Sequence, residues 1–164
     1  MSVSAAYLSS PGGVRDQIDW TPDWTRRARG FAVYAAIREL GRDGVADLVE
    51  RSCRFADGLG QGFASIPGVE LVAAPTLHQA LVRFIHPDPS VSSREQDAWN
   101  DRVIDALNRE GTAFFSGSNW GGMRVMRISV VNWQTTGNDV AKTLEAARRV
   151  VEIERRNAIL PRPA

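Results

Sequence analysis

Arg127 is the side chain best placed by its sequence context to bind an anion. It occupies the centre of an alternating, largely apolar stretch, Met123–Val131, in which Val125, Arg127 and Ser129 share one face. A guanidinium among apolar neighbours needs an anionic partner, because burying it unpaired is costly. On the residues alone a structural Asp or Glu is favoured, and a bidentate clamp on a substrate carboxylate is the alternative.

Lys142 is the one lysine among the 20 basic residues, so chemistry that needs an amine nucleophile has a single candidate. A lysine that forms a Schiff base usually lies in a desolvated pocket beside other catalytic groups. The pattern around Lys142 is that of a surface helix, with Val140 and Leu144 on either side. We therefore predict a surface lysine and no Schiff-base lysine in this chain.

Tyr7 stands in a turn-rich opening stretch, Met1–Pro22, which reads as a loop. A tyrosine on such a loop is either an anchor or a proton donor delivered by a lid. The residues alone favour the anchor.

The remaining candidates for metal, phosphate or thiol chemistry have structural explanations. His78 and His86 are eight residues apart, and Cys53 is the single cysteine, so no metal site is predicted. Cys53 lies on the apolar face of a helix and reads as a buried, inert thiol. The run Gly58–Gly62 lies late in a helical pattern with no strand before it, unlike a phosphate-binding loop.

The elements that must position these side chains follow from hydrophobic periodicity and from Gly and Pro. Two helices are predicted first, and the remaining elements alternate between pairs of short strands and single helices. The predicted order is helix 25–40, helix 43–66, strands 69–73 and 79–85, helix 93–110, strands 112–115 and 123–131, and helix 138–156. This order predicts an α/β chain of the α+β kind, with a small, mostly antiparallel sheet and helices on one face.

The first helix differs from the others because apolar residues surround it on most sides. Such a helix is normally buried in something larger or between two layers. We therefore expect residues 1–41 to lie apart from a compact unit formed by residues 42–164.

Composition limits the class of protein. The chain has 164 residues, a length that suits one ordinary domain. Its net charge of +1 gives no strong electrostatic attraction to nucleic acid or to an anionic membrane. Arg148, Arg149, Arg155 and Arg156 are offset by glutamates on the same helix. No apolar run is long enough to span a membrane and no signal peptide is evident, so a cytoplasmic setting is expected.

Three segments together resemble the group II pyridoxal-phosphate-dependent amino-acid decarboxylases. They are Asp19–Gly30 with its continuation to Gly44, His78–Phe84, and Met126–Thr136. The resemblance covers nearly the whole chain but only the C-terminal third of the family's fold-type I architecture. It implies that residues 1–41 hold a remnant of the catalytic loop and a connecting helix, and that residues 42–164 form the small domain.

The resemblance also implies an activity, decarboxylation of an L-amino acid with pyridoxal 5′-phosphate (PLP) by a homodimer. In the family, a tyrosine matching Tyr7 protonates the substrate carbon after carbon dioxide leaves, and an arginine matching Arg127 contacts a substrate carboxylate in some members. Thr25 and Arg26 match a segment near the partner subunit's cofactor. The family's cofactor lysine has no counterpart here, so the chain alone is expected to be inactive.

Two alternatives to a decarboxylase stay open. One is a PLP-dependent aminotransferase or aldehyde synthase of the same fold. The other is a stand-alone α+β binding or dimerisation module.

Overall fold

The computed structural model describes residues 27–159, and the chain divides into two compact units, Met1–Arg42 and Asp43–Ala164. Helix α1 (Arg29–Ala64) runs across the boundary between them. It is interrupted at Gly41, whose φ of 63° and ψ of −171° are not helical. Glycine adopts a positive φ at little cost, which explains why the interruption falls at this residue.

The helical segment of the first unit exposes its apolar side chains. Phe31, Val33, Tyr34, Ile37 and Leu40 are all exposed, and Phe31 retains 74% of its accessible surface. The helix therefore has apolar residues without a matching core among the described residues of this unit. Within residues 27–159, no helix is both long and apolar enough to cross a membrane.

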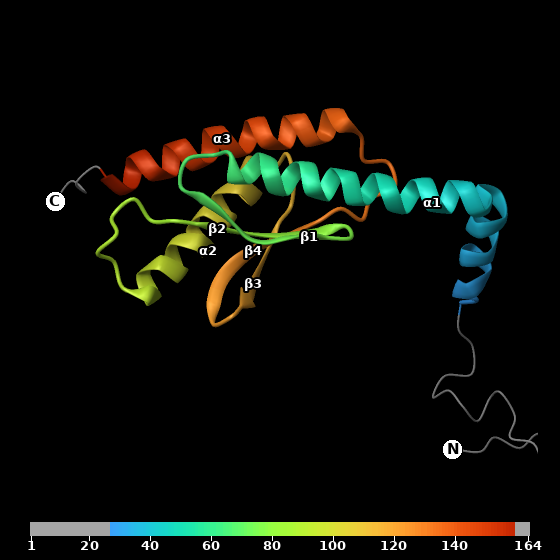
Figure 1. The fold of residues 1–164 in the computed structure, drawn as a ribbon, viewed down its shortest axis with the longest axis horizontal. Coiled ribbons are helices and arrows are strands. Elements are labelled where there is room, and N and C mark those ends of the chain that lie inside the picture. Colours follow the sequence, from blue (N-terminus) through green and yellow to red (C-terminus); the bar gives the residue numbers. More distant parts are fainter. Residues whose placement is uncertain (1–26, 160–164) are drawn as a thin grey trace, which may run out of the picture. The chain divides into compact units, whose positions relative to one another are not determined.

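The second unit is built on a four-stranded antiparallel sheet of order β1-β2-β4-β3 (Figure 1). The strands are β1 (Val69–Thr76), β2 (Gln79–Phe84), β3 (Ser116–Trp120) and β4 (Met123–Ser129). Two hairpins supply them, β1–β2 and β3–β4, and β4 pairs with β2 to join the hairpins. The predicted α+β architecture with a small antiparallel sheet is confirmed.

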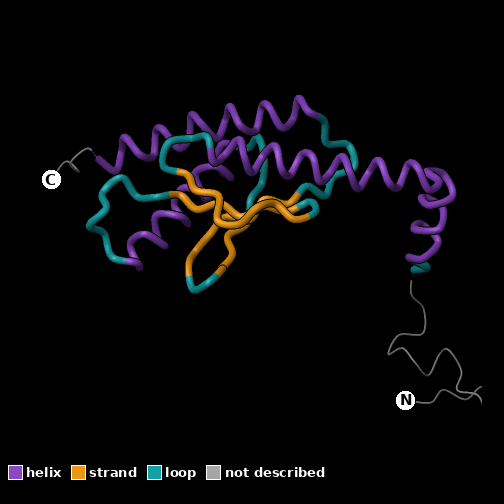
Figure 2. The backbone as a smooth tube through the Cα atoms, in the orientation of Figure 1, coloured by secondary structure: helices purple, strands orange, loops and turns teal. Residues whose placement is uncertain are grey.

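Three helices cover one face of this sheet, the second part of α1, α2 (Ser93–Glu110) and α3 (Gly137–Ile159) (Figure 2). Every second residue of β2 faces them, Ala80, Val82 and Phe84. The core is completed by Phe63 of α1, whose ring meets Phe84 and Phe115 edge-on at 6.4 and 5.6 Å between centroids. All residues of this core lie between positions 56 and 151.

Helix α2 is fixed at both ends and at its centre. Ser92 and Glu95 form a capping box at its start, and Gly111 ends it with a φ of 90°. At the centre, fully buried Asn100 accepts from the backbone N–H of Phe84 at 2.9 Å and donates to the carbonyl of Phe84 at 3.1 Å. This side chain ties the helix to the end of β2.

The predicted strand 112–115 is wrong, because the strand in this region is β3, from Ser116. The backbone N–H and carbonyl of Phe115 bond to the side chain of Asn108 instead, at 2.8 and 2.9 Å. Gly121 and Gly122, both with positive φ, form a two-residue turn that sets the β3–β4 register. The turn thus makes a strand of Ser116–Trp120, although its Ser, Gly and Asn residues have low strand propensity.

Candidate functional site

Arg127 lies on the sheet face that the helices leave uncovered. It pairs with Leu81 of β2 and with Ser116 of β3. Because Ala80 and Val82 point into the helical core, Leu81 between them points to the opposite face, and its cross-strand partners point with it. The predicted alternation along β4 therefore places Arg127 on the open face.

Arg127 lines a hollow of about 320 Å³ on this face. Its polar lining comes from Thr76, Gln79 and Ser118, and its apolar lining includes Leu81 and Trp120. The arrangement offers one cation, with hydroxyl and amide groups beside it, next to an indole and an aliphatic side chain. Such a lining can bind a carboxylate carried on a small apolar body.

Arg127 makes no salt bridge with any carboxylate of residues 27–159, unlike two neighbouring arginines. Arg83 pairs with Asp97 at 3.1 Å, and Arg124 pairs with Asp101 at 2.7 Å. The structural Asp or Glu favoured from the sequence is therefore not found among the described residues. That expectation assumed burial, whereas the uncovered face leaves Arg127 exposed and its guanidinium accessible to a ligand.

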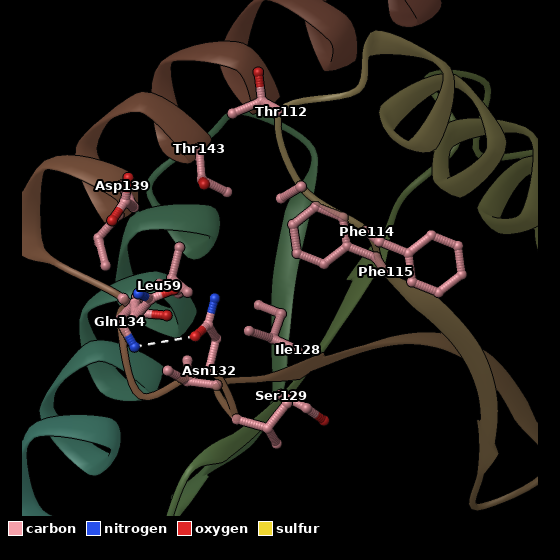
Figure 3. Close-up of a pocket in the computed structure, with 15 residues that line it drawn as sticks. Leu59, Thr112, Phe114, Phe115, Ile128, Ser129, Asn132, Gln134, Asp139 and Thr143 are labelled. Atoms are coloured by element: carbon pink, nitrogen blue, oxygen red, sulfur yellow. Dashed lines mark hydrogen bonds between the residues drawn. The ribbon is translucent and has the colours of Figure 1, made fainter. Parts of the chain in front are cut away.

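A larger cavity, of about 580 Å³, lies beyond the end of β4 (Figure 3). Its floor is apolar and buried, formed by Leu59, Phe115, Ile128 and Val130. The rim carries hydroxyl, amide and carboxylate groups, from Thr112, Asn132, Gln134, Asp139 and Thr143. None of the lining residues within the described range 27–159 is basic, so this cavity suits a carboxylate or phosphate less well than the hollow at Arg127.

Asp139, the one charged residue among the described residues that line this cavity, caps the start of α3. Hydrogen bonds from the Thr136 hydroxyl at 2.7 Å and backbone N–H at 2.9 Å hold the pKa of the Asp139 carboxyl below its usual range. The carboxylate is therefore ionised near neutral pH and bound to the helix start. Its arrangement indicates a structural role.

The other sequence candidates lie apart from both cavities. Lys142 is exposed on α3 and lines neither cavity, and Cys53 is half-buried rather than fully buried. His78 lies in the β1–β2 turn, whereas the ring of His86 packs edge-on against Trp99 with 5.1 Å between centroids. Within the described part of the chain, no group of three or more His, Cys, Asp or Glu could hold a metal ion.

The glycine run 58–62 has a packing role. It lies inside α1, as the helical pattern predicts. A Cβ at Gly60 would come within 3.2 Å of Ala80 and Pro75, and one at Gly62 would overlap Leu144 of α3. These glycines let α1 approach the sheet and α3 closely.

Three predicted site residues, Tyr7, Thr25 and Arg26, lie outside the described residues, so the structure does not place them beside Arg127. Conversely, sequence reasoning missed Ser118 and Trp120 as neighbours of the Arg127 hollow. The signal that could have found them is the Gly121–Gly122 turn, which fixes the register of β3 against β4.

The fold is shared with solved decarboxylases. Oryza sativa TDC, crystallised with PLP and tryptamine, matches with a TM-score of 0.76 and 18% identity over 93% of this chain and 32% of its own. Catharanthus roseus tryptophan decarboxylase in complex with L-tryptophan gives 0.69 and 18%, over 82% and 28%. Rhodiola rosea 4-hydroxyphenylacetaldehyde synthase gives 0.68 and 18%, over 85% and 29%.

These matches confirm the resemblance to group II PLP decarboxylases as a likeness of fold. The chain has the architecture of their C-terminal domain and spans about a third of their length. No family model matches the sequence.

Proposed function

We propose that this chain acts as the C-terminal portion of a PLP-dependent enzyme that decarboxylates an L-amino acid. The observation that carries the proposal is the likeness of fold to Oryza sativa TDC, with a TM-score of 0.76 over 93% of this chain. A small domain of this kind contributes positioning groups, whereas the cofactor supplies the electron sink for the reaction.

Arg127 is the residue that we propose binds the substrate carboxylate. Its exposure, its lack of a carboxylate partner within residues 27–159 and the polar groups around it support this role. Tyr7 is proposed as the proton donor to the substrate carbon, and Thr25 and Arg26 as residues close to the cofactor of a partner subunit. These three roles rest on the resemblance of their segments to the decarboxylase family.

The described residues do not fit PLP by themselves. The lone lysine, Lys142, is exposed on α3 and lines neither of the two cavities. We therefore propose that another part of the protein holds the cofactor. We propose in addition that the complete enzyme is a cytoplasmic homodimer.

The proposal is tested by comparing two proteins. The product of the longest reading frame that contains this sequence should bind PLP and release carbon dioxide from at least one L-amino acid. The purified 164-residue chain should do neither, and after incubation with PLP and gel filtration it should retain no absorbance of the cofactor. PLP retained by the chain through gel filtration, or decarboxylation by the chain alone, would refute the proposal that another part of the protein holds the cofactor.

Replacement of Arg127 tests the carboxylate-binding role in that longer protein. Arg127→Gln should raise KM for the amino acid about tenfold or more with a smaller change in kcat, because the lost ion pair belongs mainly to substrate binding. Arg109→Gln, at an exposed position on α2, is the matched control and should leave KM unchanged. Equal KM values for the two variants would remove Arg127 from the site.

Aldehyde formation is the second candidate, because the matched structures include Rhodiola rosea 4-hydroxyphenylacetaldehyde synthase. In relatives of the family that make aldehydes, phenylalanine replaces the loop tyrosine, so Tyr7 favours decarboxylation to the amine. In the longer protein, Tyr7→Phe should shift the product from amine toward aldehyde. An unchanged ratio of products would exclude Tyr7 as the proton donor.

A further inference from the structure

We propose that strand β3 pairs antiparallel with β3 of a second copy of this chain, so that two sheets join edge to edge. This pairing does not depend on the reaction that the chain takes part in.

The two edges of the sheet differ in how easily they can accept another strand. Edge strand β1 carries two register irregularities and Pro75, both of which hinder pairing with another strand. Edge strand β3 pairs with β4 in unbroken register and contains neither proline nor a charged residue.

The outward direction of the β3 backbone follows from a contact of β4. The backbone N–H of Arg124 donates to Asp97 of α2 at 3.1 Å and therefore points away from β3. Asn119, which lies opposite Arg124, then forms a non-hydrogen-bonded pair with it. The N–H and carbonyl of Asn119 consequently point away from β4, as do those of Gly117 and Phe115 at intervals of two residues.

One of these three positions is already capped. The Asn108 side chain bonds both the N–H and the carbonyl of Phe115, much as a neighbouring strand would. At Gly117 and Asn119, no hydrogen-bond partner for the outward backbone groups occurs among residues 27–159. The edge therefore offers two adjacent pairing positions, and unpaired strand edges of this kind are templates for another strand.

A second copy satisfies both positions at once. An antiparallel pairing with Ser118 on the two-fold axis sets Gly117 of each copy opposite Asn119 of the other, which gives four interchain hydrogen bonds from these groups. The same register sets the exposed Trp120 opposite the small Ser116 of the other copy. Among residues 27–159, pairing leaves only the two β1 edges free, so the assembly closes as a dimer.

The first test compares two substitutions at one position. Asn119→Pro removes the outward N–H, whereas Asn119→Ala keeps it, and both remove the same amide side chain. Sedimentation velocity and light scattering on the full chain should show a concentration-dependent dimer for wild type and Asn119→Ala. For Asn119→Pro we expect association at least about tenfold weaker, with thermal unfolding by circular dichroism used to verify folding.

The second test does not depend on tolerance of proline. Ser118→Lys and Ser118→Glu each put like charges opposite each other on the two-fold axis and should be monomeric alone. A one-to-one mixture of the two should restore the dimer, since the charges then attract. The proposal is overturned if wild type is monomeric up to its highest soluble concentration, or if both single charge variants associate as wild type does. It is also overturned if the mixture stays monomeric.

Discussion

At the scale of single residues, the arginines of the sheet differ in whether a carboxylate of α2 lies within reach. Arg83 and Arg124 reach carboxylates of α2 and fasten the helix to the strands. Arg127, on the uncovered face, has no such partner within residues 27–159.

Periodicity in the sequence could predict which residues of β4 share a face with Arg127. It could not show that the helices leave this face open, because that depends on how three distant helices pack.

Asn100 is the residue whose loss should destabilise the second unit most directly. Asn100→Ala leaves the buried N–H of Phe84 without a partner, while Gln96 still donates to the Phe84 carbonyl, and should lower the free energy of unfolding by roughly 1–3 kcal/mol. Urea unfolding followed by circular dichroism measures this. Asn157→Ala, at an exposed position of α3 where the side chain makes no hydrogen bond within residues 27–159, is the control and should not lower stability. Equal effects of the two substitutions on the free energy of unfolding would contradict the stabilising role of Asn100.

The helix caps predict a loss of stability in acid. Hydrogen bonds from the Ser92 hydroxyl and backbone N–H lower the pKa of Glu95 below its ordinary value of 4.5, and Asp139 is lowered in the same way by Thr136. A carboxyl whose pKa is depressed in the folded state stabilises the protein above its unfolded pKa, and this contribution is lost as the pH falls. Stability should therefore decline below about pH 5. In urea unfolding measured at several pH values, the double variant Glu95→Gln with Asp139→Asn should lose less free energy of unfolding in acid than wild type does. An unchanged pH dependence would contradict the role given to these two caps.

At the scale of elements, the sequence predicts α2 well because residues at the two helix ends set its boundaries, Ser92 with Glu95 at the start and Gly111 at the end. The region around β3 is predicted poorly for a physical reason. Phe114 and Phe115 have strand propensity, but Asn108 of α2 takes the backbone groups of Phe115. The Gly121–Gly122 turn is the feature of the sequence that indicates the true strand. The strand propensities of individual residues do not take such a turn into account.

The glycines of α1 give a matched pair of substitutions. Gly58→Ala meets nothing within 4 Å and should raise the free energy of unfolding by about 0.5–1 kcal/mol, because alanine is the better helix former. Gly62→Ala should lower it by about 1–3 kcal/mol, because the added methyl overlaps Leu144 of α3. Chemical denaturation measures both. A stabilising Gly62→Ala would show that α1 and α3 are not held this closely.

At the scale of the whole molecule, the buried core and the exposed apolar helix belong to different units. Every residue of the core lies between positions 56 and 151, whereas Phe31, Val33 and Tyr34 are exposed in the first unit. Exposed apolar residues that recur along one helix mark a surface which another protein segment normally covers. The second unit therefore holds the interactions that a cooperative fold requires.

Removal of residues 1–42 should consequently leave the second unit folded. The chain 43–164 should unfold cooperatively with a midpoint within about 3 °C of the full chain, because the deletion removes no core residue. It should also bind less 1-anilinonaphthalene-8-sulfonate, since the exposed apolar residues of the first helical segment are gone. Loss of the sharp thermal transition would show that the first unit contributes to the core. Undiminished dye binding would place the accessible apolar surface in the second unit, at residues such as Val131 and Trp133, which are 77% and 68% exposed.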